Sequence, residues 1–168
     1  MNIFVTNEDP EIAAYEHCSV HCNKQLLEYS QILCTAHRVY GNDDPRLYKA
    51  THINHPCSVW ARQCLENYQW LYKAFSSLCE VFWQSRGKVH ATDKKLSQLL
   101  SEPPVGIPSN YSGQVQGFVM AIPSDYQDIS VTQSYQRYLN AKFQEWQGRA
   151  KPVDVTFPVA KPSWAVVS

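Results

Sequence analysis

Apolar side chains recur at helical spacing along most of this chain. The clearest series lies between Pro56 and Ser85 and consists of Trp60, Cys64, Tyr68, Leu71, Phe75, Leu78 and Phe82. This spacing is typical of one face of an α-helix and continues for about six turns. Gly87 follows as a natural stop. We therefore predict one long central helix that begins at Pro56 and ends near Ser85.

Shorter helices are expected on both sides of the central helix. Asp9 and Pro10 are typical of an N-cap and a first helical position, Gly41 is typical of a helix end, and Thr92 is a suitable N-cap. Residues with helical periodicity adjoin each of these signals. The predicted helices cover residues 10–17, 19–40, 92–100 and 131–147.

The helical pattern is interrupted in two places. Residues 105–128 are rich in glycine, proline and serine, so they predict a long irregular surface segment. Residues 151–168 contain three prolines and predict an extended tail that packs on the body or is partly disordered. Residues 1–150 then form one α-helical domain. The expected fold is mostly α, a compact single-domain helical bundle around the central helix with little or no sheet.

The helix predicted over 19–40 has one polar face. At roughly 100° per residue, its polar side chains fall within an arc of about 100°. They are His21, Lys24, Glu28, Gln31, Thr35 and Arg38. One interpretation is a solvated surface with an ion pair between Lys24 and Glu28. The other is the wall of a site, in which Glu28, Lys24 and His21 form an acid-base set.

Length and charge narrow the classes of function. The chain has 168 residues, and its 15 Lys and Arg balance 15 Asp and Glu, so it lacks the basic excess of a general nucleic-acid binder. It has no apolar run long enough to span a membrane and no export signal, so we expect a cytoplasmic protein without membrane contact. It also has no glycine-rich phosphate loop and no GxSxG motif, which excludes the common nucleotide-hydrolysing and acyl-transfer classes.

Cysteine and histidine residues raise the questions of disulfides and metals. The six cysteines lie in helical, aromatic-rich sequence, so we expect reduced and buried thiols. The spacings of His17 to His21 and of Cys18 to Cys22 would permit zinc, but they match no established zinc motif. We therefore expect no metal and no other cofactor.

Two groups of residues are candidates for holding a phosphate. His52, Asn54 and His55 precede Pro56, and the free N–H groups at a helix start favour an anion. The alternative is that these residues simply cap the helix. The second group follows the central helix and consists of Arg86, Lys88, His90, Lys94 and Lys95. These cations either contact nucleic-acid phosphates or complement the helix dipole.

Several short segments together resemble a group of small, poorly characterised phage and bacterial proteins. They are Asp9-Pro10, His21 with Lys24 and Glu28, Cys34-Thr35-Ala36-His37-Arg38, Thr51-His52-Ile53-Asn54-His55-Pro56 before Trp60, and Arg86-Gly87-Lys88-Val89-His90. The resemblance covers residues 2–100. More remotely, the chain is similar to the phage pyrimidine-dimer DNA glycosylases, which are small α-helical enzymes that act on ultraviolet-damaged DNA.

The remote resemblance implies a role for Glu28. Those glycosylases carry a histidine and, seven residues later, a glutamate, and His21 and Glu28 have the same spacing. Glu28 would then be the catalytic carboxylate. The same enzymes use the α-amine of the mature N-terminus as nucleophile. Because Asn2 is bulky, Met1 is expected to be retained, and Lys24 is the alternative amine.

Two functions from different classes remain. The first is a phage-type DNA- or nucleotide-processing enzyme that acts on a pyrimidine base or its glycosidic bond, with Glu28 as the acid-base and Lys24 and His21 beside it. The residues expected to contact phosphate or substrate are Gln31, Thr35, Arg38, His52, Asn54, His55, Arg62, Arg86 and Lys88. The second function is that of a non-catalytic phage protein that engages a host protein or sequesters a nucleotide.

Overall fold

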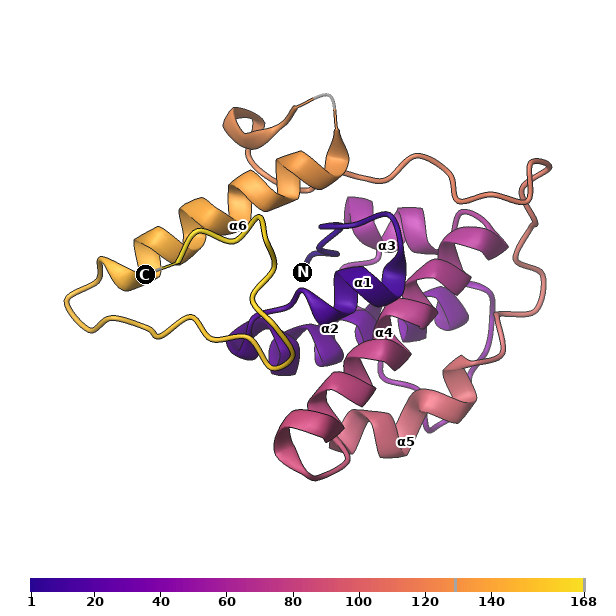
Figure 1. The fold of residues 1–168 in the computed structure, drawn as a ribbon. Coiled ribbons are helices and arrows are strands. Elements are labelled where there is room, and N and C mark those ends of the chain that lie inside the picture. Colours follow the sequence, from indigo (N-terminus) through magenta and orange to yellow (C-terminus); the bar gives the residue numbers. More distant parts are fainter. Residues whose placement is uncertain (129, 168) are drawn as a thin grey trace.

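Two long helices that pack against each other form the centre of the molecule (Figure 1). The computed structural model describes residues 1–128 and 130–167. The apolar faces of α2 (Ser19–Val39) and α4 (Leu65–Arg86) are buried in the core and bear Leu26, Tyr29, Phe75 and Leu78. The described residues are mostly helical and none of them lies in a strand, which confirms the predicted fold class.

Three short helices surround this central pair. α1 (Pro10–Tyr15) packs on α4, while α3 (Pro56–Ala61) and α5 (Ala91–Leu100) contact both α2 and α4. The predicted N-cap of α1 is confirmed, because Asp9 Oδ1 accepts two first-turn N–H groups at 2.8 and 3.2 Å. The predicted end of α2 is confirmed as well, because Gly41 follows it with a left-handed φ of 84°.

The predicted central helix is broken in two, contrary to the expectation of one continuous helix. The N–H of Leu65 donates to the carbonyl of Pro108 at 2.8 Å. The buried amide of Asn67 donates to the carbonyl of Trp60 and accepts from the N–H of Gln116, each at 2.9 Å. Pro108 and Gln116 belong to the long loop after α5. This loop therefore supplies the hydrogen-bond partners that replace helical ones at the break.

The predicted N-cap of α5 was also wrong. The helix begins at Ala91, and Nδ1 of His90 accepts the N–H of Thr92 at 3.1 Å. Thr92 lies inside the helix, where its buried hydroxyl forms a 3.1 Å hydrogen bond with the hydroxyl of Tyr48. A histidine ring nitrogen thus takes the capping role that the sequence pattern assigned to a threonine.

α6 (Val131–Gln147) has the bounds that were predicted. It packs on the N-terminal segment 2–6, which is extended and contributes the buried side chains of Ile3, Phe4 and Val5. The ring centroids of Phe4 and Tyr135 lie 6.2 Å apart in this contact. The N-terminal segment is therefore enclosed between α2 and α6.

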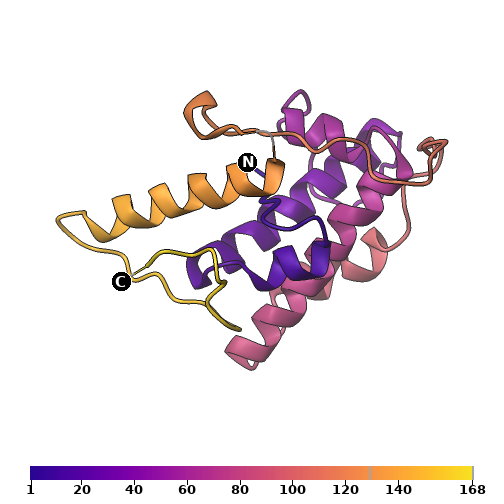
Figure 2. The ribbon, with the colours of Figure 1, turned by 45° about the horizontal axis from the view of Figure 1, so that its top comes forward.

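The tail after α6 lies beside α6 and reaches the beginning of α2 (Figure 2). The carbonyl of Thr156 accepts the N–H of Ser19 at 2.7 Å. The side chain of Asn140 donates to the carbonyl of Trp164 at 2.9 Å and accepts the N–H of Val166 at 2.8 Å. Over residues 151–167 the tail is thus extended and attached to both helices.

Candidate active site around Glu28

The carboxylate of Glu28 lies where the N-terminal segment meets α2. Its side chain is only 13% exposed. Oε2 accepts the backbone N–H of Asn2 at 3.0 Å and lies 4.0 Å from the amino nitrogen of Met1. Oε1 lies 3.4 Å from Nζ of Lys24. One half-enclosed carboxylate is therefore flanked by two amines.

Met1 is anchored by its side chain. That side chain is 3% exposed, and its sulfur accepts a 3.7 Å hydrogen bond from the hydroxyl of Ser58. Because the residue as a whole is only half-buried, its exposed surface belongs to the backbone atoms. Unlike the buried Met1 side chain, the Lys24 side chain is 65% exposed and pairs with Glu28 from the solvent side.

Asn2 fixes the N-terminal segment to three other parts of the molecule. Its Nδ2 donates to the carbonyl of Ala121 at 3.0 Å, and its Oδ1 accepts the hydroxyl of Tyr135 at 2.9 Å. Its carbonyl accepts Nε2 of Gln25 at 3.4 Å. Gln25 is buried, and its Oε1 has no hydrogen-bond partner among the described residues. No periodicity in the sequence distinguishes Asn2 or Gln25 from ordinary polar residues.

His55 lies close to this carboxylate and amine. Its Nδ1 accepts the N–H of Cys57 at 3.2 Å, so the ring caps α3 as the capping interpretation predicted. Its pKa is lowered first by burial and then by electrostatic interactions with the Met1 amino group and His52, while Glu28 acts in the opposite direction. Nε2 is therefore the ring nitrogen that remains for other contacts.

The loop before α3 is held in place from two sides. Thr35 bonds both the N–H and the carbonyl of Thr51 through its hydroxyl, each at 3.2 Å, and Arg62 donates to the carbonyl of Ile53 at 2.7 Å. These two predicted substrate-binding residues thus support the loop, Thr35 from a buried position and Arg62 from a half-buried one. The loop presents the exposed side chains of His52 and Asn54.

His52 has a left-handed backbone, with φ of 48°. This conformation is rare for residues other than glycine and persists only where the surroundings enforce it. Nδ1 of His52 lies 2.8 Å from the hydroxyl of Thr51, and its carbonyl accepts the N–H of His55 at 2.9 Å. The two histidines are therefore fixed relative to each other by the backbone of this turn.

His21 and Arg38 lie on the polar arc of α2 but are occupied by structural contacts. His21 is 3% exposed, and its ring packs against Phe4, Phe143 and Trp146. Burial lowers the pKa of His21 to about 3, with a further contribution from nearby positive charges. The Arg38 guanidinium donates to the carbonyls of Asn42, Asp44, Leu47 and Tyr48. Neither side chain faces a substrate site in this structure.

Three other predicted site residues lie at or near the surface. Gln31 follows Glu28 on α2 and is half-buried. Arg86 and Lys88 are exposed at the end of α4. Of the predicted set, the structure thus brings together Glu28, Lys24 and His55, and it adds Met1 and Asn2.

The cysteines are free and buried. Burial raises the pKa of the thiols of Cys22, Cys34 and Cys57 to about 11, so these thiols are neutral. Within residues 1–128 and 130–167, no cluster of three or more His, Cys, Asp or Glu side chains is arranged to hold a metal ion. None of the described helices has the length and apolar character needed to span a membrane.

Comparisons of the chain with protein-family models, with curated proteins and with solved structures give no match. The geometry around Glu28 is therefore the main indication of function. That geometry consists of a shielded carboxylate, two amines within 4.0 Å of it and an adjacent imidazole.

Proposed function

We propose that this protein is a DNA- or nucleotide-processing enzyme of the DNA glycosylase type, which acts on the glycosidic bond of a pyrimidine nucleotide. The observation that carries the proposal is the position of Glu28 between two amines, with Nζ of Lys24 at 3.4 Å and the amino nitrogen of Met1 at 4.0 Å. A carboxylate beside an amine is the pair that such chemistry requires. The resemblance of the sequence to the pyrimidine-dimer glycosylases supports the same assignment.

The proposed reaction uses the amine as nucleophile and Glu28 as acid-base. The amine nitrogen forms a bond to C1′ of the sugar while the bond from C1′ to the base breaks. The base leaves with the bonding electron pair, and Glu28 accepts the proton that the attacking amine loses. The negative charge of Glu28 also stabilises the positive charge that develops on the sugar. The bond from C1′ to O4′ of the sugar then breaks as Glu28 returns its proton to O4′, and the nitrogen lone pair forms the C=N bond of a protonated imine between the enzyme and the DNA.

Of the two amines, we favour that of Met1. Its buried side chain and the hydrogen bonds of Asn2 fix its position, whereas Lys24 is mostly exposed and its side chain is long and flexible. A nucleophile that is already positioned loses little entropy when the substrate binds. His55 has its pKa lowered toward the neutral form and uses Nδ1 to accept the N–H of Cys57, so its Nε2–H can donate a hydrogen bond to the leaving base, which takes its proton from water.

The experiment that tests this proposal is borohydride trapping. The protein is incubated with ultraviolet-irradiated, abasic or undamaged duplex DNA, the imine is reduced, and the cross-linked residue is identified by peptide mapping. We expect a cross-link at Met1 and a loss of base release of about 100-fold or more in Glu28→Gln. A cross-link at Lys24 would reassign the nucleophile, and the absence of both cross-link and base release would overturn the proposal.

A matched control tests whether the position of the lysine matters. Lys73 is exposed to a similar extent as Lys24 and also pairs with a glutamate, Glu11, at 3.1 Å, but it lies on α4. Lys24→Ala should lower base release because Glu28 loses a cation beside it. Lys73→Ala should leave base release unchanged. Equal losses in the two variants would show that the effect is one of net charge.

The alternative is a non-catalytic binding protein. One observation favours it: Tyr111 and Val105 in the loop after α5 are almost fully exposed, and such residues are common at protein contacts. This function predicts no base release from any DNA substrate. It also predicts that binding to a host protein is lost in Tyr111→Ser and retained in Glu28→Gln.

A further inference from the structure

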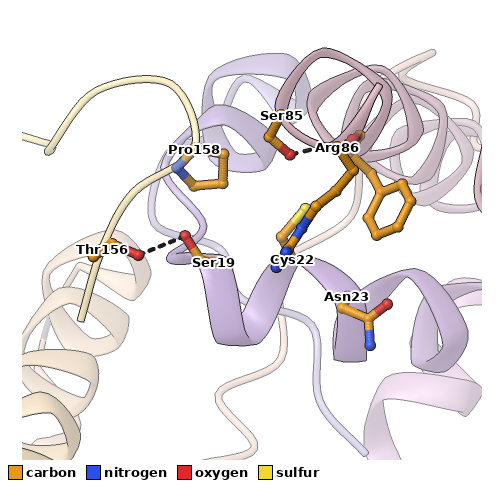
Figure 3. A pocket seen from close by; sticks show the side chains of 8 residues that line it. Ser19, Cys22, Asn23, Ser85, Arg86, Thr156 and Pro158 are labelled. Carbon is orange, nitrogen blue, oxygen red and sulfur yellow. Dashed lines mark hydrogen bonds between the residues drawn. The ribbon is translucent and has the colours of Figure 1, made fainter. Parts of the chain in front are cut away.

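A cavity of about 370 Å³ lies between the beginning of α2, the end of α4 and the tail (Figure 3). This volume is within the range of small-molecule sites. Its polar lining comes from all three parts of the chain and includes Ser19, Asn23, Ser85, Arg86 and Thr156. The cavity is distinct from the surroundings of Glu28, since neither Glu28 nor Met1 contributes to its lining.

Arg86 is the only charged residue among the described residues that line the cavity. In Figure 3 its side chain extends from the end of α4 toward Cys22 on α2. No described residue forms an ion pair or a side-chain hydrogen bond with its guanidinium. Cys22 does not provide the missing negative charge, because burial raises the pKa of its thiol to about 11 despite the nearby guanidinium. The cavity thus contains a positive charge without a counter-ion from the protein.

Hydrogen-bond donors surround this charge. The hydroxyls of Ser19 and Thr156 lie 2.8 Å apart (Figure 3), so one of their two protons is used between them and the other is available to a ligand. Asn23 adds an exposed side-chain amide at the mouth of the cavity. The hydroxyl of Ser85 is already used, because it donates to the carbonyl of Phe82 at 3.1 Å.

We propose that this cavity binds the phosphate group of a nucleotide or of a nucleic-acid strand. A guanidinium with two available hydrogen-bonding side chains beside it and no carboxylate among the described residues that line the cavity is complementary to a phosphate. The first-turn position of Ser19 adds the positive end of the α2 dipole. The tail closes one side of the cavity through Thr156, so ligand binding also holds the tail against α2.

The cavity and the candidate active site lie on different faces of α2. Glu28 follows Cys22 by six residues, which corresponds to about 9 Å along the helix axis and, at about 100° per residue, to a rotation of about 120° around it. A nucleic-acid strand that occupies both sites must therefore pass around α2. This assignment to a DNA phosphate rests on the proposed function, whereas binding of a free phosphate does not.

The test measures binding directly and does not depend on turnover. Isotope-labelled protein is titrated with inorganic phosphate, thymidine 5′-monophosphate and a short DNA duplex, and the backbone amide signals are followed by nuclear magnetic resonance. We expect shifts at residues 19–23 and at Thr156. We also expect about tenfold weaker binding in Arg86→Ala, because a charge-assisted hydrogen bond is lost. Shifts confined to other parts of the molecule would overturn the proposal.

Two further variants make the test specific. Arg149 also lies at a helix C-terminus and is exposed, but it is paired with Glu145 and lies outside the cavity, so Arg149→Ala should bind all three ligands normally. Asn23→Leu places an apolar side chain at the mouth and should weaken binding without changing the fold. If Arg86→Ala and Arg149→Ala lose affinity equally, the effect is one of net charge and the cavity is not a site.

The three ligands separate the sources of the phosphate. If the duplex uses the cavity, Arg86→Ala should reduce the slope of log K against log salt concentration by about 1. An unchanged slope together with weakened binding of thymidine 5′-monophosphate assigns the cavity to free nucleotides. Glu28→Gln should retain all of this binding. Base release that fails while the cavity still binds phosphate would overturn the proposed function alone.

Discussion

The backbone N–H of Asn2 donates a hydrogen bond of 3.0 Å to Oε2 of Glu28, 26 positions further along the chain. This contact gives Glu28 two tasks. Its carboxylate holds the N-terminal segment against α2, and the same oxygen lies next to the amino nitrogen of Met1. A substitution at Glu28 therefore affects the position of the amine as well as the chemistry of the carboxylate.

Two substitutions at Glu28 should separate these tasks. Gln keeps an oxygen that can accept the N–H of Asn2, so Glu28→Gln should lower the free energy of unfolding by less than about 1 kcal/mol. Ala leaves that N–H unpaired in a half-buried place, so Glu28→Ala should cost about 1–3 kcal/mol. Urea unfolding followed by fluorescence measures both values. Equal losses of stability in the two variants would show that the contact with Asn2 contributes nothing.

Arg38 should prove to be a structural residue. Its guanidinium donates to four backbone carbonyls of the segment from Asn42 to Tyr48, at 2.9 to 3.3 Å. A lysine has no planar fork of donors, so Arg38→Lys should still lower the free energy of unfolding, by roughly 1–3 kcal/mol. The folded variant should keep its affinity for DNA. A selective loss of DNA affinity at full stability would instead support the phosphate-binding role predicted from the sequence.

The buried histidines should make the protein less stable in mild acid. Burial lowers the pKa of His17 to about 4 and that of His21 to about 3, so both are neutral in the folded protein. In the unfolded chain a histidine has a pKa of about 6.5. As the pH falls below about 6.5, the unfolded state binds protons that the folded state does not. The free energy of unfolding should therefore decrease toward pH 4, by up to roughly 3 kcal/mol for His17.

A variant at His21 tests the origin of this pH dependence. His21→Leu removes the titrating ring from its cage of Phe4, Phe143 and Trp146, so the free energy of unfolding should fall less steeply between pH 6.5 and pH 4. Phe75 is fully buried and its ring packs against Tyr72, outside this cage, so Phe75→Leu should lower stability equally at every pH. Thermal unfolding at a series of pH values measures both. Parallel pH profiles for His21→Leu and the unchanged protein would contradict the assignment.

Local signals in the sequence were sufficient for several helix ends. Asp9 and Gly41 act through their own neighbours, by a side-chain cap and by a left-handed φ, so a local pattern identifies them. The break between α3 and α4 could not be found in this way. Nothing in the sequence around Cys64 excludes a helix, and the partners that break it, Pro108 and Gln116, come from a distant loop.

The candidate site was only partly predictable for the same reason. Helical periodicity identified the polar arc of α2 and with it Glu28 and Lys24. It could not show that other segments fold over part of this arc and use Thr35 and Arg38 as hydrogen-bond donors to their carbonyls. Met1 is the clearest case: its expected retention argued against a role for the N-terminal amine, yet its side chain is the part that is buried.

The break between α3 and α4 can be tested at Asn67, which is fully buried and bonds both Trp60 and Gln116. Asn67→Leu keeps the size of the side chain but leaves two backbone groups unpaired, so it should lower the free energy of unfolding by roughly 2–4 kcal/mol.

Asn140 is a matched control, because it makes the same pair of bonds, to Trp164 and Val166, in a half-exposed place. Water can replace these bonds, so Asn140→Leu should cost about 1 kcal/mol or less. Urea unfolding gives both values, and hydrogen exchange should show faster opening at Gln116 in Asn67→Leu alone. A small loss in Asn67→Leu would mean that the break is set by the loop backbone, through Leu65 and Pro108, and not by this amide.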